Sequence, residues 1–466
     1  MPLSLIVFLV VWSLLRLGLA MLFPLTADES YYWLWAKHLS WSYVDHPPMV
    51  AFINYLTTRG TENLFLLRSG AILISLLVSL LIYFLAKEAF NEKVAFFSAV
   101  LFQILPHFLI VWLTMFVELP LALFWTLSLV IILTIVKTSK QALWYLLGLV
   151  LGLGYLSKYT MFLFWPCLAL FFLISSEDRF WLKRIEPYLC FLLSFAFFFP
   201  VIFWNYHHHW VSFLFHSGKA TAEPWAINFL PFLVDQLVHF SPFLIFTLYP
   251  VSKYALKENK ETKLLFSFSF PILLLFLFLS LKLKVWAHWP SIGYLGLIPI
   301  TVAYLVKAGK SLKRFITWIS LFSLLVLMVL FFVSPAVLLH QKEYARNYKL
   351  SVLVPKEYKV FAKTNVTASL LEFYLKRPTY LATGFLKPYS IWGEKQYEIW
   401  GIPSLAKGET IVYYGEDSPE FRKRAMTHFE KIEALKGIRM YLIEDYITNY
   451  YRFFKLINFK GKEGHP

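Results

Sequence analysis

The chain has 466 residues, of which 59% are hydrophobic, 20% aromatic and only 15% charged. Soluble domains carry about 25% charged residues, so this composition excludes a soluble enzyme, a disordered chain and a disulfide scaffold. The net charge of +16 is spread over short loops between apolar runs. That pattern is typical of a polytopic membrane protein and argues against nucleic acid as a partner.

Apolar stretches of about 20 residues, the length that a membrane helix needs, recur along the chain. They predict eleven α-helical spans, over residues 5–25, 64–86, 94–113, 119–136, 142–157, 159–175, 188–206, 231–251, 264–283, 291–306 and 315–339. We expect the first stretch to be a retained helix, because it is long for a signal peptide and lacks a basic N-terminal region. The fifth and sixth stretches are separated only by Ser157-Lys158, which leaves open whether both are full spans.

Lysine and arginine are distributed unevenly between alternate loops. Fifteen of them lie in the loops 87–93, 137–141, 176–187, 252–263 and 307–314, whereas the opposite and longer set of loops holds six. Because cytoplasmic loops collect basic residues, the first set is expected inside. The chain is therefore predicted to be a multi-pass protein of the inner cell membrane, with the long loop 26–63 and the C-terminus outside.

The composition changes after residue 340, where 14 of the 28 acidic residues occur. The local patterns predict a small α/β fold with an amphipathic helix over 368–376, a strand over 411–415, a helix over 418–432 that begins with Ser418 and Pro419, and a strand over 437–445. We therefore expect two domains, a transmembrane catalytic domain over 1–340 and an extracytoplasmic α/β domain over 341–466.

The predicted outer loops contain an unusual set of polar side chains. They are Asp28, Glu29, Asp45 and His46 in the first loop, Glu118 at the start of the fourth span, and Lys158, His208, Lys284 and His288 in later loops. A carboxylate can accept a proton from an attacking hydroxyl, and lysine or histidine can neutralise a leaving phosphate. Paired carboxylates can also hold a divalent metal ion. Because no GxGxxG or P-loop motif occurs, no nucleotide cofactor is expected.

Five blocks of the sequence carry a family resemblance, and they follow one another in the family's order. They are LTADESYYWLWAKHLSWSYVDHPP, FVELPLALFWTLSL, GLGYLSKYTMFLFWP, PVIFWNYHHHWVSFLFH and HWPSIGYLGLIP. With them the chain resembles the bacterial family 39-like glycosyltransferases. These are GT-C fold enzymes related to the lipid A aminoarabinose transferase and to protein O-mannosyltransferases.

The resemblance implies an inverting transferase that takes a sugar from a polyprenyl phosphate. Its acceptor would be a glycolipid such as lipid A, a polysaccharide or a protein, met at the membrane lipid surface outside the cytoplasm. On the family pattern Asp28 matches the catalytic base, with Glu29 beside it at the substrate, and Glu118 matches a second acidic position of the active site. Asp45 matches a carboxylate that binds metal or orients substrate.

The basic residues of the family pattern are matched in part. Lys158 matches a recurrent lysine and is expected to contact phosphate, and His208 lies near a histidine that can ligate a metal. His46 stands where the lipid A enzymes tend to have lysine, and His288 stands where relatives often have asparagine. Together with Lys284, these residues are expected to bind substrate.

Simpler structural roles remain open for several of these residues. Thr26 and Glu29 have the spacing of a capping box, in which two side chains close the start of a helix. Lys158 and Lys284 can extend from helix ends toward the membrane surface. Arg16 lies within the first span and must have partners there.

Two other functions remain open as well. A transporter or flippase of lipid-linked sugars would place polar groups near the bilayer midplane, often in repeated halves, and the sequence has no repeat. A receptor or assembly protein would explain the C-terminal domain but not the acidic residues of the loops.

Overall fold

A computed structural model describes residues 1–23, 25–222, 228–333, 352, 354–383, 386, 394–435 and 451–461. The chain separates into two compact units. We call the first the helical unit; it comprises Met1–Gly18, His46–Val50 and Arg68–Met328. We call the second the mixed unit; it comprises Leu19–Asp45, Ala51–Leu67 and Val329–Pro466.

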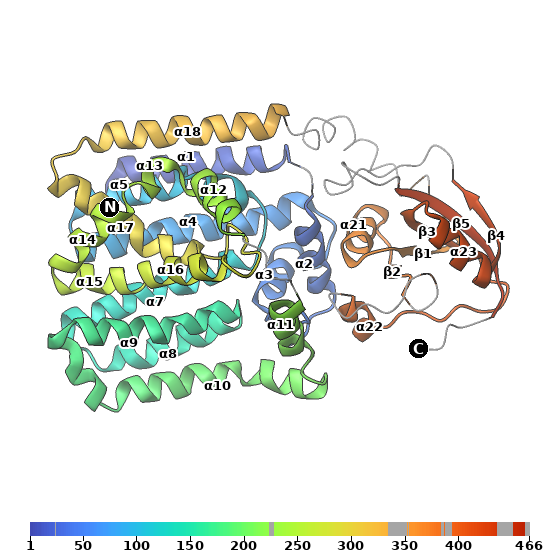
Figure 1. Cartoon of the computed structure of the whole chain (residues 1–466), viewed down its shortest axis with the longest axis horizontal. Coiled ribbons are helices and arrows are strands. Elements are labelled where there is room, and N and C mark those ends of the chain that lie inside the picture. Colours follow the sequence, from blue (N-terminus) through green and yellow to red (C-terminus); the bar gives the residue numbers. More distant parts are fainter. Residues whose placement is uncertain are drawn as a thin grey trace. The chain divides into compact units, whose positions relative to one another are not determined.

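The helical unit consists of helices that lie side by side, as α7, α8 and α10 do in Figure 1. Its elements are α1 (Leu3–Ala20), most of α4 (Leu64–Ala89), α5 (Glu92–Ile104), α6 (Pro106–Ile110), η1 (Val111–Leu113), α7 (Glu118–Thr138), α8 (Ala142–Tyr155), η2 (Tyr159–Leu163), α9 (Phe164–Ile174), η3 (Ser176–Lys183), α10 (Glu186–His207), α11 (Val211–Ala222), α12 (Phe229–Phe240), α13 (Pro242–Ile245), α14 (Leu248–Lys257), α15 (Lys260–Ser267), α16 (Phe270–Leu279), α17 (Ser291–Lys307) and most of α18 (Leu312–Val333).

Six helical segments among the described residues are long and apolar enough to cross a membrane, or up to eight if each of two bent pairs is one span. The chain is thus a multi-pass membrane protein, but the count of eleven spans is not confirmed. Three of the predicted spans correspond to shorter apolar helices, Ala142–Tyr155, Tyr159–Ile174 and Ser291–Lys307. The first two are the pair on either side of the Lys158 turn.

Two predicted spans are broken. Helix α5 ends before Pro106, where the chain bends by 64°, because proline has no N–H to continue the helical hydrogen bonds. The chain bends by 105° between α12 and α13, where Ser241 has a φ of 70°. A break exposes backbone carbonyls that lipid cannot satisfy. Just beyond the first break, Arg16 supplies donors to the short helices that follow, since its Nη2 donates to the carbonyls of Phe108 in α6 (2.7 Å) and Trp112 in η1 (3.1 Å).

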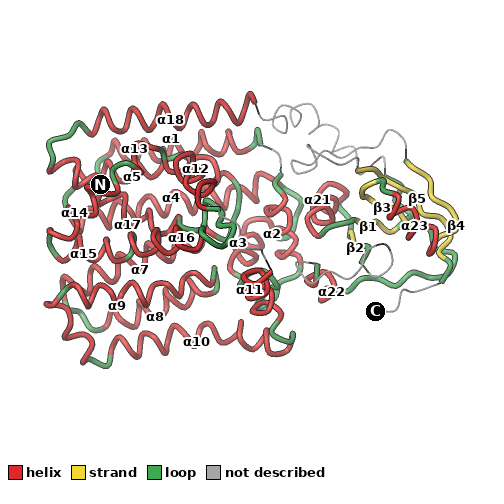
Figure 2. The backbone as a smooth tube through the Cα atoms, viewed as in Figure 1, coloured by secondary structure: helices red, strands yellow, loops and turns green. Residues whose placement is uncertain are grey.

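The mixed unit contains a five-stranded sheet, drawn in yellow in Figure 2. Its elements are α2 (Ala27–Lys37), α3 (Met49–Thr58), β1 (Lys359–Ala362), α21 (Asn365–Leu375), β2 (Thr379–Leu381), α22 (Lys395–Trp400), β3 (Ile411–Glu416), α23 (Pro419–His428), β4 (Phe429–Ala434) and β5 (Tyr451–Phe459). The strand order is β2-β1-β3-β5-β4, with the first two pairings parallel and the last two antiparallel. Phe421 and Ala425 of α23 pack with Phe361, Tyr413 and Phe454 in the core.

Most C-terminal predictions are confirmed. Helix α21 covers the helix predicted over 368–376, β3 matches the strand predicted over 411–415, and α23 begins at Pro419 with Ser418 as its cap. The helix predicted over 418–432 is too long, because the chain from Phe429 onward forms β4 and pairs with β5. The strand predicted over 437–445 lies outside the described residues.

The first outer loop falls mainly in the mixed unit, whereas we assigned loop 26–63 to the transmembrane domain. Residues 19–45 and 51–67 therefore form one compact body with the sheet. The domain boundary at residue 340 stays a prediction, because residues 334–351 lie outside the described part of the chain.

Candidate functional site

Three of the predicted site residues meet in the helical unit. Glu118 is the first residue of α7, Lys158 follows α8, and His288 precedes α17. Glu118 Oε1 accepts a hydrogen bond from Lys158 Nζ and lies 3.4 Å from His288 Nε2. Only 4% of Glu118 and 8% of Lys158 are exposed. We call these three side chains the Glu118 cluster.

Local structure explains how Lys158 reaches this position. The N–H groups of Ser157 and Lys158 both donate to the carbonyl of Gly154, which closes the end of α8 in a tight turn. A Cβ on Gly154 would lie 2.8 Å from the side chain of Met161, which would have to shift to make room for it. Glu118 sits in the first turn of its helix, where the helix dipole favours a negative charge.

The electrostatics of the cluster follow from its burial. A buried ion pair is stable only when its charges are close and hydrogen-bonded, as those of Lys158 and Glu118 are. Burial lowers the pKa of His288 from its usual value; Glu118 opposes this shift and Lys158 adds to it. The lowered pKa favours the neutral form of His288 at pH 7. An added phosphate would shift this balance toward protonation of His288.

Two histidines next to the cluster were not singled out from the sequence. His107 on α6 is buried, and neither of its ring nitrogens has a hydrogen-bond partner among the described residues. Its ring lies 5.6 Å from that of His239 on α12, and both histidines are close enough to His288 to interact with it electrostatically. Both residues lie beside the bends of broken spans, and these bends were not predicted. A histidine inside an apolar stretch was the signal that could have identified them.

The acidic residues of the first loop occupy helix α2 of the mixed unit. Thr26 and Glu29 form the expected capping box: Glu29 N donates to Thr26 Oγ1 (3.3 Å), and Thr26 N donates to Glu29 Oε2 (3.4 Å). Glu29 is fully buried, whereas Asp28 beside it is exposed. Glu29 thus starts the helix that presents Asp28, and its expected contact with substrate stays a prediction.

Asp45 is also hydrogen-bonded to helix α2. Its Oδ2 accepts a hydrogen bond from the hydroxyl of Tyr31 at 3.0 Å. Burial and the Asp45 carboxylate together raise the pKa of Tyr31 well above its ordinary value, so this hydroxyl remains a donor. The next residue, His46, belongs to the helical unit, where its ring lies 5.9 Å from that of His216 on α11.

The other two predicted residues lie elsewhere in the helical unit. Lys284 Nζ lies 4.3 Å from the centre of the Trp286 ring, a cation–π contact. His208 follows α10, and its Nδ1 lies 2.7 Å from the carbonyl oxygen of Trp204. That contact requires a proton on Nδ1 and leaves Nε2 for any ligand.

Asp45 and His208 are the predicted metal ligands. A tight site for a divalent ion needs three or more protein donors around one point. The described residues contain no group of three histidine, cysteine, aspartate or glutamate side chains placed to hold a metal ion. The two residues therefore do not by themselves make such a site, and their role as ligands stays a prediction.

Comparisons with known proteins place this geometry in context. Residues 45–204 match the family described as dolichyl-phosphate-mannose-protein mannosyltransferase. The lipid A galacturonosyltransferase RgtD of Rhizobium johnstonii is 22% identical over 183 residues, which span 39% of this chain and 38% of that relative. The chain thus covers well under half of the curated relative that it matches.

Several solved structures share the fold, including the following two. ArnT from Cupriavidus metallidurans bound to undecaprenyl phosphate superposes with a TM-score of 0.66 at 11% identity, over 98% of each chain. The oligosaccharyltransferase AglB from Archaeoglobus fulgidus, in complex with an inhibitory peptide and a dolichol-phosphate, gives a TM-score of 0.52 at 13% identity, over 91% of this chain and 71% of that one. The chain thus shares the GT-C fold of these two structures, and its residues 45–204 are similar to the protein mannosyltransferases.

Proposed function

We propose that this protein transfers a sugar from a polyprenyl phosphate to a hydroxyl of an acceptor outside the cytoplasm. The observation that carries the proposal is the buried Glu118 cluster at the helix ends of a chain that has the fold of ArnT. Charged groups buried at membrane depth are expensive and mark sites of chemistry. ArnT has been solved with undecaprenyl phosphate, and a relative acts on lipid A, so a glycolipid is the acceptor class that we favour.

The chemistry follows from the side chains. The acceptor hydroxyl attacks the anomeric carbon while Asp28 takes its proton, and an exposed carboxylate at the start of a helix suits that role. The new C–O bond forms as the bond between the anomeric carbon and the phosphate oxygen breaks. The configuration at that carbon is inverted, and polyprenyl phosphate leaves.

The leaving phosphate needs positive charge and hydrogen-bond donors. The Lys158 ammonium has three N–H donors and directs one at Glu118, so others can turn to a phosphate oxygen. The neutral His288 can take up a proton as that phosphate develops charge. Asp45, which accepts a hydrogen bond from Tyr31, can orient the substrate.

The test is transfer by purified protein in proteoliposomes. Detergent-extracted donor lipid and lipid A are supplied, and mass spectrometry follows glycosylated acceptor and released polyprenyl phosphate. We expect both products from the native protein. Asp28→Asn should lower the rate by at least 100-fold with unchanged thermal unfolding, because the amide cannot accept the proton.

The exposed residue Leu39 supplies a control, since it follows helix α2 and Leu39→Asn changes the same segment of chain without removing a carboxylate. Transfer at the native rate by Asp28→Asn would remove Asp28 as the base. Movement of donor lipid across the bilayer without any glycosylated acceptor would instead identify a flippase and overturn the transferase proposal.

A further inference from the structure

Helix α2, which carries Asp28, is attached to the C-terminal part of the chain along one face. Ser30, Trp33 and Lys37 lie at positions i, i+3 and i+7, so they form a single stripe on the helix. Each of them contacts helix α21, which is more than 300 residues away in sequence. Both helices belong to the mixed unit.

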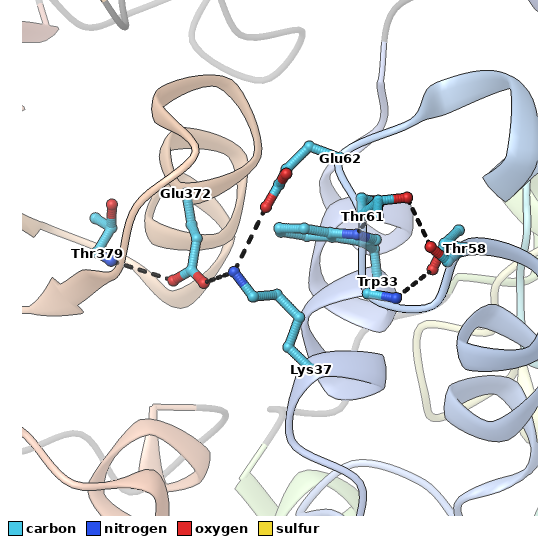
Figure 3. A network of polar contacts seen from close by, with 8 residues as sticks. Trp33, Lys37, Thr58, Thr61, Glu62, Glu372 and Thr379 are labelled. Atoms are coloured by element: carbon cyan, nitrogen blue, oxygen red, sulfur yellow. Dashed lines mark hydrogen bonds and ion pairs between the residues drawn. The ribbon is translucent and has the colours of Figure 1, made fainter.

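The contacts along this stripe are of three different kinds. The hydroxyls of Ser30 and Ser369 are 2.9 Å apart, the ring of Trp33 meets that of Phe373 edge-on at 5.0 Å, and Lys37 Nζ donates to Glu372 Oε1 at 2.8 Å. Figure 3 shows the last of these, with the Lys37 ammonium lying between two carboxylates.

Glu372 is the centre of this network. It is 4% exposed, its second oxygen accepts from Thr379 N at 3.1 Å, and Lys37 is the cation that faces it (Figure 3). The other carboxylate on Lys37, Glu62, lies at 3.6 Å and is more exposed. Without Lys37 the buried Glu372 would face Glu62 with no described cation between them, so the two helices would separate or repack.

A second element holds the far end of the same segment. The ring of His38 stacks on that of Trp400 of α22 at 4.8 Å, and Val44 N donates to Gln396 Oε1 at 2.9 Å. The segment from α2 to Asp45 is thus attached to the C-terminal part of the chain at several points. This attachment is more than an outer loop needs merely to connect two spans.

Geometry makes such an attachment matter for catalysis. Asp28 and Lys37 are nine residues apart on one helix, or about 13 Å along its axis. A tilt of about 5° at the Lys37 end therefore moves Asp28 by about 1 Å. A misplacement of about 1 Å at a reacting group can cost about 100-fold in rate.

We propose that helix α21 positions helix α2 for the transfer reaction, and that Lys37 and Glu372 are positioning residues that act through Asp28. The proposal rests on the transferase function and on Asp28 as its base. It gives the C-terminal domain a part in catalysis, rather than a part only in binding an acceptor.

The first test compares substitutions of Lys37 in the proteoliposome assay. We expect Lys37→Met and Glu372→Gln to lower kcat at least tenfold while KM for the donor lipid changes less than threefold. Lys37→Arg keeps the charge and should retain kcat within about threefold. Lys359→Met, which removes an ion pair with Glu409 on the sheet at 2.9 Å, is the matched control and should leave kcat unchanged.

The second test restores the attachment by another bond. Ser30→Cys and Ser369→Cys are introduced together into the Lys37→Met variant and oxidised with copper phenanthroline, and the crosslink is verified by mass spectrometry. Both serines are buried next to each other, and the native Cys167 and Cys190 are buried and free. We expect the crosslink to raise kcat at least fivefold and reduction with dithiothreitol to reverse the gain.

The outcomes separate the two proposals. Three outcomes would each overturn the positioning role while leaving the transferase intact: the native kcat in Lys37→Met, failure to form the crosslink, or a crosslink that does not restore kcat. The positioning role would also be overturned if the activity of Lys37→Met fell only in proportion to the amount of folded protein. Full activity of Asp28→Asn would instead remove the base, and absence of transfer in the native protein would remove the proposed function.

Discussion

At the scale of single residues, the Glu118–Lys158 pair belongs to the proposed active site and also contributes to the stability of the fold. Both side chains are buried, so each depends on the other to compensate its charge. Glu118→Gln and Lys158→Met should each destabilise the protein by about 3–5 kcal/mol, because either one leaves an unpaired buried charge. Thermal unfolding in detergent measures the effect.

The double variant is the control for this prediction. Glu118→Gln combined with Lys158→Met leaves no charge behind, so its loss of stability should be smaller than the sum of the two single losses. Additive losses would show that the two side chains do not compensate each other, and would contradict the pairing that the structure gives.

His288, in the same cluster, makes the stability of the folded protein depend on pH. Its pKa is lowered in the folded protein by burial and by Lys158, against the opposing Glu118, with His107 and His239 as further neighbours. Below pH 6.5 the unfolded chain therefore binds a proton that the folded protein takes up only at lower pH. Stability should fall as the pH drops from 7 through this range.

The measurement is the unfolding temperature of the native protein and of His288→Asn between pH 7.5 and 5. Asparagine does not titrate, so it removes this proton-binding group while keeping a polar side chain. The pH dependence should be weaker in the variant. An equal fall in both proteins would show that His288 does not contribute to it.

At the scale of elements, local signals predicted where helices begin but not where they break or end. Ser418 and Pro419 predicted the start of α23, and the side chain of Ser418 accepts from Phe421 N as a cap does. Its end at His428 depends on β5, which pairs with Phe429 onward. The bend at Ser241 did have a local signal, because Pro242 follows it, and we did not use that signal. The end of α23 instead depends on tertiary contacts, which a local pattern does not contain.

The same reasoning applies to the candidate site. Glu118, Lys158 and His288 could be named from the sequence because each stands in a block that resembles a segment of the family pattern. The partnership of Lys37 with Glu372 could not be, since charged residues are common in loops and nothing local links residues 335 positions apart. Arg16 was expected to have partners, but its acceptors Ser75 and Gln103 became evident only in the structure.

At the scale of the whole molecule, each compact unit is built from segments that are far apart in the sequence. The segment that contains Asp28 follows the first helix, yet it forms one unit with strands near the C-terminus. Two lengths of chain from opposite ends must therefore meet in the same compartment. This constrains the topology, because residues 26–63 and the sheet must lie on the same side of the membrane.

The distribution of Lys and Arg predicts that this side is the exterior. The prediction can be tested with cysteines at two exposed positions, Leu39 in the first outer loop and Lys310 between α17 and α18. In intact cells with a permeabilised outer membrane, an impermeant maleimide should label Leu39→Cys, and it should label Lys310→Cys only after the inner membrane is opened. The reverse pattern would put Asp28 in the cytoplasm and remove the extracytoplasmic acceptor from the proposed reaction.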